Sequence, residues 1–139
     1  MLFRSVDVTL GHIDWHDTVY PMLIAETTHR SWVELLSQAI ANDHPIPHQQ
    51  LHDAHFCQFG QWLTSEQTKG QPYTQLPAFL AIDAPHRRVH AVAQNIDRSW
   101  RAGNTAEAKA MLPELWAARD AVLSALRDLQ IAVSTNRMQ

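Results

Sequence analysis

Several residue types that define whole classes of protein are scarce in this chain. Its 139 residues include one cysteine, four glycines and two tyrosines. A single cysteine excludes an internal disulfide, so its thiol is a packing residue, a metal ligand or a reactive group. Long apolar runs are missing too, which excludes a membrane-spanning helix, and the N-terminus has no apolar block typical of a signal peptide. We therefore expect a cytoplasmic protein that makes no contact with a membrane.

The charge balance excludes a second group of functions. Eleven Lys and Arg residues stand against fourteen Asp and Glu residues, for a net charge of −3. Proteins that bind nucleic acid usually carry a basic patch or stripe, so we expect no nucleic-acid partner. Hydrophobic residues make up 45% of the chain, enough for one core of ordinary size. With no internal repeat and no second compositional block, residues 1–139 are expected to form one domain.

The alternation of apolar and polar residues that marks β-strands is not found, and the pattern predicts four helices. They cover residues 14–41, 49–65, 76–101 and 105–133, with loops at 42–48 and 68–72 between the first three. Pro85 is expected to bend or restart the third helix, and Pro113 to kink the fourth. Asn104 and Glu107 resemble a capping box before the fourth helix. Because the connections are short, the fold class is all-α, an antiparallel up-down four-helix bundle.

Three of the predicted helices carry apolar residues at helical spacing, and the third does so at alternating steps of three and four, like a coiled-coil seam. The predicted inward positions are Met22, Ala25, His29, Trp32, Val33, Leu36 and Ile40 in the first helix, Phe79, Ile82, His86, Val89, Ala93, Ile96 and Trp100 in the third, and Leu112, Leu115, Val122, Leu126, Leu129 and Val133 in the fourth. Histidine thus occupies core positions on two helices.

Histidine is also the outlier of the composition, with nine copies. His86 and His90 are four residues apart, so their imidazoles share one helix face at a spacing that suits a single metal ion. His29 lies on the inward face of the first helix. Cys57 lies in the predicted second helix, on a strip of small residues that neighbouring helices can approach. Three helices can therefore bring three imidazoles and one thiol to the same place.

Three nitrogen donors and one sulfur donor form a closed tetrahedral set that Zn²⁺ binds readily. The sequence therefore predicts an internal zinc site, with Trp32 and Trp62 packed around it. Four protein ligands leave no open position for a reactive water, so we expect a protein that is not an enzyme. Glu26, Asp53 and Asp83 each precede a ligand by three or four residues and could orient it, or be ordinary surface carboxylates.

Other interpretations fit parts of the pattern. A buried His or Cys is often a simple core residue. The pairs Glu26/His29 and Asp83/His86 would suit a di-iron bundle of the hemerythrin or ferritin type, although the second and fourth helices offer no clear bridging carboxylates. An exposed His86 beside two arginines would suit phosphotransfer, and a zinc enzyme would require one ligand to leave the metal.

The remaining histidines could form a weak accessory metal site or a delivery route, or be ordinary surface residues. Two lie near the N-terminus, two in the proline-containing loop and two at the start of the predicted second helix. They are His12, His16, His44, His48, His52 and His55.

Three motifs in order give a more specific indication. C-Q-F-G-Q-W at residues 57–62 fits the pattern C-x-F-G-x-W, H-R-S-W at 29–32 fits H-x-x-W, and H-R-R-V-H at 86–90 fits H-x-x-x-H. Together they resemble the chemoreceptor zinc-binding domain family, over roughly residues 15–133. The resemblance implies a four-helix bundle that holds one zinc ion through His29, Cys57, His86 and His90.

The resemblance also implies a function. Domains of this family usually accompany bacterial chemoreceptors or diguanylate cyclases and can form symmetric dimers. Zinc occupancy, or oxidation of the zinc thiolate by hypochlorous acid, changes their signalling output. We therefore expect a regulatory domain that forms a homodimer and acts on a signalling partner. The sequence contains no methyl-accepting hairpin and no cyclase domain. The chain is therefore either a stand-alone module, whose output is a partner protein or the handling of free zinc, or a fragment whose missing part carries the output.

Overall fold

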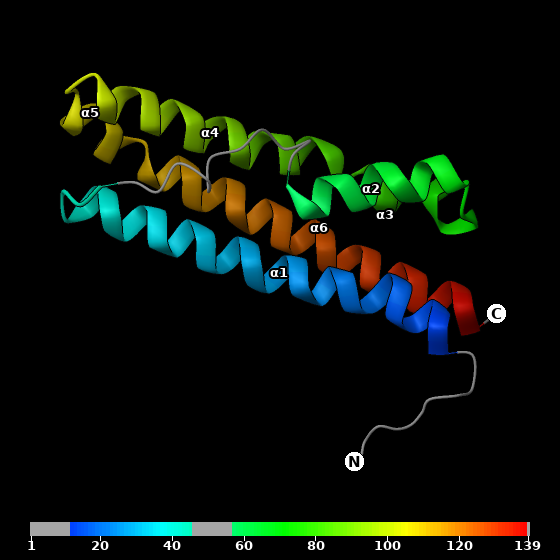
Figure 1. Ribbon diagram of the computed structural model, residues 1–139. Coiled ribbons are helices and arrows are strands. Elements are labelled where there is room, and N and C mark those ends of the chain that lie inside the picture. Colours follow the sequence, from blue (N-terminus) through cyan, green and yellow to red (C-terminus); the bar gives the residue numbers. More distant parts are fainter. Residues whose placement is uncertain (1–11, 46–56, 139) are drawn as a thin grey trace, which may run out of the picture.

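The computed structural model describes residues 12–45 and 57–138 (Figure 1). Within these two ranges every regular element is a helix, so the predicted all-α class is confirmed. The elements are α1 (His12–Ala41), α2 (Gln58–Lys69), the 3₁₀-helix η3 (Pro72–Gln75), α3 (Pro77–Leu80), α4 (Asp83–Arg101), α5 (Thr105–Ala110) and α6 (Leu112–Met138).

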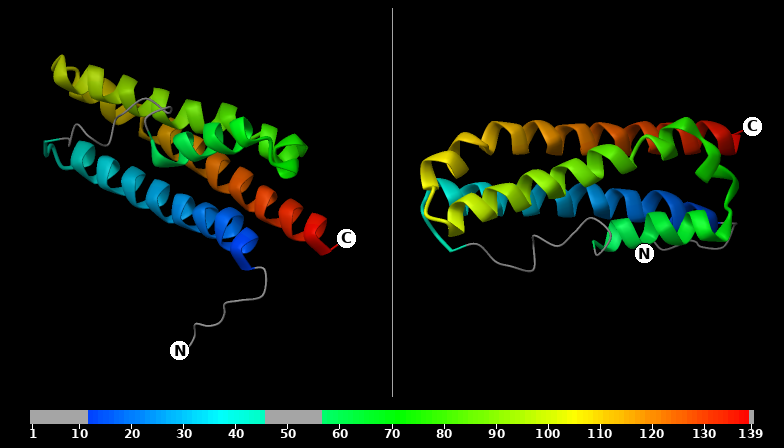
Figure 2. Two further views of the ribbon diagram at one scale, coloured as in Figure 1. Left: turned by 45° about the vertical axis from the view of Figure 1, so that its right-hand side comes forward. Right: turned by 90° about the horizontal axis from the view of Figure 1, so that it is seen from above.

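The three long helices form the body of a helical bundle. Helix α6 packs against both α1 and α4, and the shorter α2 packs against α1 (Figures 1 and 2). Short helical segments connect these helices at their ends, namely η3, α3 and α5. Among the described residues, none of the helices combines the length and the apolarity that crossing a lipid bilayer requires.

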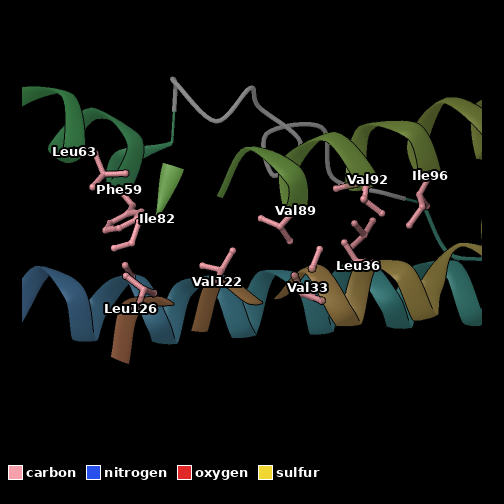
Figure 3. Packing of buried hydrophobic residues seen from close by; sticks show 14 of the residues in the cluster. Val33, Leu36, Phe59, Leu63, Ile82, Val89, Val92, Ile96, Val122 and Leu126 are labelled. Carbon is pink, nitrogen blue, oxygen red and sulfur yellow. The ribbon is translucent and has the colours of Figure 1, made fainter. Parts of the chain in front are cut away.

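The predicted core is confirmed almost residue for residue. Every position expected to face inward on the first, third and fourth predicted helices is buried, apart from Trp32 and Trp100, which are half-buried. Figure 3 shows Val89 of α4 directed toward Val33 of α1 and Val122 of α6. Because burying one such side chain contributes about 1.5–3 kcal/mol, this common core makes a large favourable contribution to the stability of the bundle.

Two prolines divide helices that the apolar pattern had joined. The predicted third helix, residues 76–101, is broken after α3 and restarts as α4, whose first turn contains Pro85. The fourth is likewise divided into α5 and α6, with Pro113 as the second residue of α6. Proline is accepted in a first helical turn because no intrahelical partner awaits its missing N–H there.

The predicted start of the second helix, which lies near the cysteine, was wrong. Helix α2 begins at Gln58, so Cys57 is its N-cap, with extended backbone angles of φ −66° and ψ 140°. Residues 49–56, the predicted start of this helix, lie outside the described residues. The helix ends at Lys69 because Gly70 takes the left-handed conformation, φ 69°, and donates its N–H to the carbonyl of Gln67.

Candidate metal centre

The structure brings together all four residues that the sequence selected as ligands. His29 comes from α1, Cys57 from the N-cap of α2, and His86 and His90 from successive turns of α4. Each offers one nitrogen or sulfur atom, and these atoms all lie within 4.8 Å of one another. The three histidines are buried and the cysteine is half-buried, so the cluster lies inside the bundle and reaches the surface at the sulfur.

His29 is held in one tautomer by its own helix. Its Nδ1 lies 2.8 Å from the carbonyl oxygen of Ala25, four residues earlier. A carbonyl only accepts hydrogen bonds, so Nδ1 carries the proton and Nε2 keeps the lone pair that a metal needs. Nε2 lies 3.8 Å from the sulfur of Cys57. Burial lowers the pKa of His29 and the Ala25 hydrogen bond only partly offsets this, which favours the neutral imidazole.

The N-cap position accounts for the state of the Cys57 thiol. Burial raises its pKa, but the neighbouring His90 imidazole and the backbone N–H groups of Gly60 and Phe59 lower it by more, so the pKa falls below its ordinary value. The His90 ring acts here through proximity, since neither of its nitrogens makes a well-formed hydrogen bond. A sulfur ahead of a helix N-terminus, where backbone N–H groups are unpaired, is favoured as the thiolate that binds metals.

The N-cap position of Cys57 changes the role that the sequence gave to Gly60. Gly60 is buried in the first turn of α2 and its backbone faces the sulfur. The sequence had suggested a mid-helix strip of small residues on which neighbouring helices could approach the thiol, and that explanation was wrong because the helix starts after Cys57. The backbone N–H of Gly60 instead helps to lower the pKa of the thiol.

The imidazoles of His86 and His90 complete the cluster. Their ring centroids lie 4.9 Å apart, and that of His29 lies 5.1 Å from His86 and 5.9 Å from His90. Both ring nitrogens of His90 are buried without a hydrogen-bond partner among the described residues. Leaving a buried polar group unpaired costs about 1–3 kcal/mol, which a cation bound by the ring would relieve.

The donor set identifies the kind of ion that fits. Neutral imidazoles and a thiolate suit borderline-soft ions such as Zn²⁺, whereas Mg²⁺ and Ca²⁺ select oxygen donors. Among the described residues the cluster includes no Asp or Glu. Bridging carboxylates define the di-iron bundles, so this geometry does not favour that alternative. The phosphotransfer interpretation was wrong, because His86 is only 1% exposed and so is not open to a phosphodonor.

The carboxylates proposed to orient the ligands are engaged elsewhere. Glu26 accepts a hydrogen bond from Arg127 at 3.1 Å, and Asp83 pairs with Arg87 at 2.9 Å on the exposed side of α4. Asp53 lies outside the described residues. The group that orients His29 is the Ala25 carbonyl, a backbone atom that carries no signature in the sequence beyond its position one turn before the histidine.

Aromatic rings enclose the imidazoles. Phe59 of α2 meets His86 and His29 edge to face, with centroid distances of 5.2 and 5.9 Å. Trp32 lies against His90, with centroids 4.7 Å apart and planes at 26°. Trp62, predicted to pack around the metal, instead stacks on Phe59 at 5.8 Å. The sequence indicated an aromatic wall but not which ring each tryptophan contacts.

Six further histidines are not members of the metal cluster or lie outside the described residues. His44 follows the end of α1 and is exposed, and among the described residues it belongs to no metal-binding group. Three others, His48, His52 and His55, lie outside the described residues, as do the side chains of His12 and His16. An accessory metal site on these residues stays a prediction.

A helical bundle whose interior gathers three imidazoles and a thiol defines a class of protein, the metal-binding helical domains. The comparison with known families then gives the particular one. Residues 29–96 match the model of the chemoreceptor zinc-binding domain, so the predicted resemblance to this family is confirmed for that part of the chain. The match begins at His29 and ends six residues after His90, and so includes all four clustered side chains. Neither the curated proteins nor the solved structures gave a significant match.

Proposed function

We propose that the chain is a zinc-binding regulatory domain in which His29, Cys57, His86 and His90 ligate one Zn²⁺ ion. The observation that carries the proposal is the convergence of these four donors, from three helical segments, within 4.8 Å. The family match supports it independently of the geometry. When bound, the ion supplies the positive charge that stabilises the thiolate and links three helices at one point.

In this proposal residues 1–139 form one antiparallel up-down four-helix bundle. The course of the chain in Figures 1 and 2 supports the arrangement, because α1 and α6 lie side by side while α5 and the turn before it join α4 to α6 at one end. Each residue of the site then has a defined task. The Ala25 carbonyl holds the proton of His29 on Nδ1, Cys57 contributes its sulfur as thiolate, and Phe59 keeps water from the imidazoles.

The signal in this proposal is zinc, an oxidant such as hypochlorous acid, or both. Thiolates are the form of cysteine that oxidants attack, and a sulfenic acid is a poorer zinc ligand. A surface hollow of about 380 Å³ is bounded by Cys57, Ile24, Phe59 and Trp62, among others, and offers an approach to the sulfur. Mass spectrometry after brief exposure to hypochlorous acid tests this: an oxidised Cys57 with released zinc supports it, and an unmodified cysteine with zinc retained ends it.

The domain is further proposed to act in the cytoplasm as a homodimer that modulates a signalling protein, such as a chemoreceptor or a diguanylate cyclase. Large apolar side chains that remain on the surface of the long helices, among them Leu35 at 53% and Ile131 at 65% exposure, are consistent with a protein partner. The molar mass in solution, measured by light scattering, tests the dimer. A monomer at all accessible concentrations would remove that part of the proposal.

Metal analysis of the purified protein tests the function itself. We expect one zinc per chain in the wild type and much less in Cys57→Ala, with both proteins equally helical by circular dichroism. Ser65→Ala, an exposed residue of α2, serves as the matched control and should retain its zinc. A wild type that binds no zinc from buffered solutions, or a Cys57→Ala variant that binds it with unchanged affinity, would refute the proposal.

A further inference from the structure

His90 differs from His29 in how its ring is oriented. Histidines that bind metals usually donate their second ring N–H to an acceptor, which fixes the ring plane, and His29 does so to Ala25. Neither nitrogen of His90 has a hydrogen-bond partner among the described residues. Within the described part of the chain, packing is therefore the contact that can direct this imidazole toward the other three donors.

The flat face of Trp32 is what the His90 ring rests on. The two rings are stacked, with centroids 4.7 Å apart and an interplanar angle of 26°. Trp32 comes from α1, one turn after His29, and its ring meets His29 at 6.2 Å and 84°. One indole on α1 therefore contacts a clustered imidazole on its own helix and another on α4.

Ring contacts hold the indole there. Its Nε1 is buried and lacks a hydrogen-bond partner among the described residues. Burying an unpaired N–H is unfavourable, so a phenyl or aliphatic side chain would avoid a cost that Trp32 bears. The broad ring surface is what faces His90.

Building on the proposed function, we infer that Trp32 is a positioning residue for zinc binding, which fixes the plane of the His90 imidazole by stacking in place of a hydrogen-bond acceptor. Rotation of the His90 ring about its Cβ–Cγ bond would carry its nitrogens away from the cluster and into the indole. Trp32 therefore raises zinc affinity through His90 and does not touch the ion.

The experiment measures zinc affinity by competition with a chelator. Removing a group that orients a metal ligand typically costs 10–100-fold in affinity, so we expect Trp32→Leu to bind zinc roughly 10-fold or more weakly. Trp100→Leu is the matched control, since Trp100 is also half-buried against the core but lies ten residues beyond His90 on α4. Trp100→Leu should bind zinc with wild-type affinity even if its melting temperature falls as far as that of Trp32→Leu.

A double-mutant cycle separates positioning from a general structural role. In a His90→Ala background, Trp32→Leu should change zinc affinity by less than about twofold, because the ring that the indole orients is gone. An undiminished effect in that background, or equal losses in Trp32→Leu and Trp100→Leu, would overturn the inference. If the wild type binds zinc and Trp32→Leu binds it equally well, the inference fails while the proposed function stands.

Trp32→Phe and Trp32→Met keep the inference falsifiable should Trp32→Leu fail to fold. Phenylalanine preserves a flat ring without the indole N–H, and methionine fills similar space without a flat face. We expect Trp32→Phe to remain within about threefold of the wild-type zinc affinity and Trp32→Met to show roughly the 10-fold loss. Equal affinities of these two variants would show that stacking does not matter.

Discussion

At the scale of single residues, the cluster shows how one helix prepares a histidine for a metal. The Ala25 carbonyl and the surrounding apolar side chains act on His29 in opposite directions, and burial has the larger effect on its pKa. The folded chain therefore holds His29 as the neutral imidazole, with the lone pair of Nε2 toward the sulfur. A ligand poised in this way need not lose a proton before it binds a cation.

The lowered pKa of His29 predicts how the metal-free protein responds to acid. Because the unfolded chain binds this proton more tightly than the folded one, stability is greatest above the unfolded pKa of about 6.5 and falls as the pH drops below it. One proton gives a slope of at most about 1.4 kcal/mol per pH unit. Urea denaturation of chelator-treated protein between pH 8 and pH 5.5 measures it.

His29→Leu is the control for this slope. It removes the titrating ring and keeps the position apolar, so its stability should depend less on pH than that of the wild type over the same range. Identical slopes in the two proteins would mean that other groups govern the acid response.

At the scale of helices and turns, the sequence predicted some features and not others, and the difference has a physical cause. Faces follow from periodicity, because side chains at helical spacing must be buried together. The start of α2 did not follow, because Cys57 is not one of the Ser, Thr, Asp or Asn residues that mark an N-cap in a sequence, and its side chain makes no capping hydrogen bond. The capping box at Asn104 was also wrong. Asn104 is the N-cap of α5 but its side chain makes no capping bond, and Glu107 accepts from Ser99 instead.

The metal site, like the helices, could be predicted from the sequence only in part. Its four donors could be named because metal ligands are particular residue types at particular spacings. The groups that surround and orient these donors could not be named from the sequence. The Ala25 carbonyl and the stacked face of Trp32 are fixed by the backbone and by packing between helices, and many other residues would present the same pattern in the sequence.

The end of α1 contains the one described non-glycine residue with a positive φ, and it yields a prediction for this helix. Asp43 has φ 57°, which lets the His44 N–H reach the Ala39 carbonyl at 2.8 Å, and its carboxylate pairs with Lys109 at 3.3 Å. Asp43→Gly and Asp43→Ala both remove the ion pair, but only alanine resists the left-handed conformation. We expect Asp43→Ala to be less stable than Asp43→Gly by about 1 kcal/mol in thermal or urea unfolding. Equal stabilities would show that this turn relaxes freely.

The far end of α2 is attached through a buried carboxylate. Glu66 is 4% exposed and accepts hydrogen bonds from the hydroxyl of Tyr73 in η3 and from Lys69 at 3.3 Å. Tyr73→Phe keeps the ring that packs on Phe79 but removes the hydroxyl donor. We expect a loss of about 1–3 kcal/mol, because the buried carboxylate is left short of a partner. Urea denaturation of Tyr73→Phe measures the loss.

Glu66→Gln tests whether the cost arises from this contact. In that background the charge is gone, so Tyr73→Phe should cost clearly less than in the wild type. The same loss in both backgrounds would place the effect elsewhere in η3.

At the scale of the whole molecule, the core and the metal centre make separate contributions to stability. Helices α1, α4 and α6 share a continuous apolar core, which does not depend on the four clustered donors. Helix α2 packs on α1, contacts α3 and α4 through Trp62 and Phe59, and has the ligand Cys57 as its N-cap. A bound ion would link α1 to α4, which the core already joins through α6, and would attach the start of α2 to both through Cys57. This makes α2 the element whose position zinc or oxidation can bias.

Removal of zinc should consequently loosen one helix and leave the others in place. We expect chelator-treated protein to keep most of its helical circular dichroism, because burial in the common core persists. Amide hydrogens of α2, residues 58–69, should exchange faster by about tenfold or more, which is the exchange signature of local opening that costs at least 1.4 kcal/mol less. Helix α6 is the internal control, since it contributes no donor to the cluster and should keep its protection. Exchange measured by mass spectrometry with and without chelator decides the matter: equal protection of α2 in both states would rule out a zinc-driven change in this helix, and a general loss that includes α6 would mean that zinc holds the whole fold.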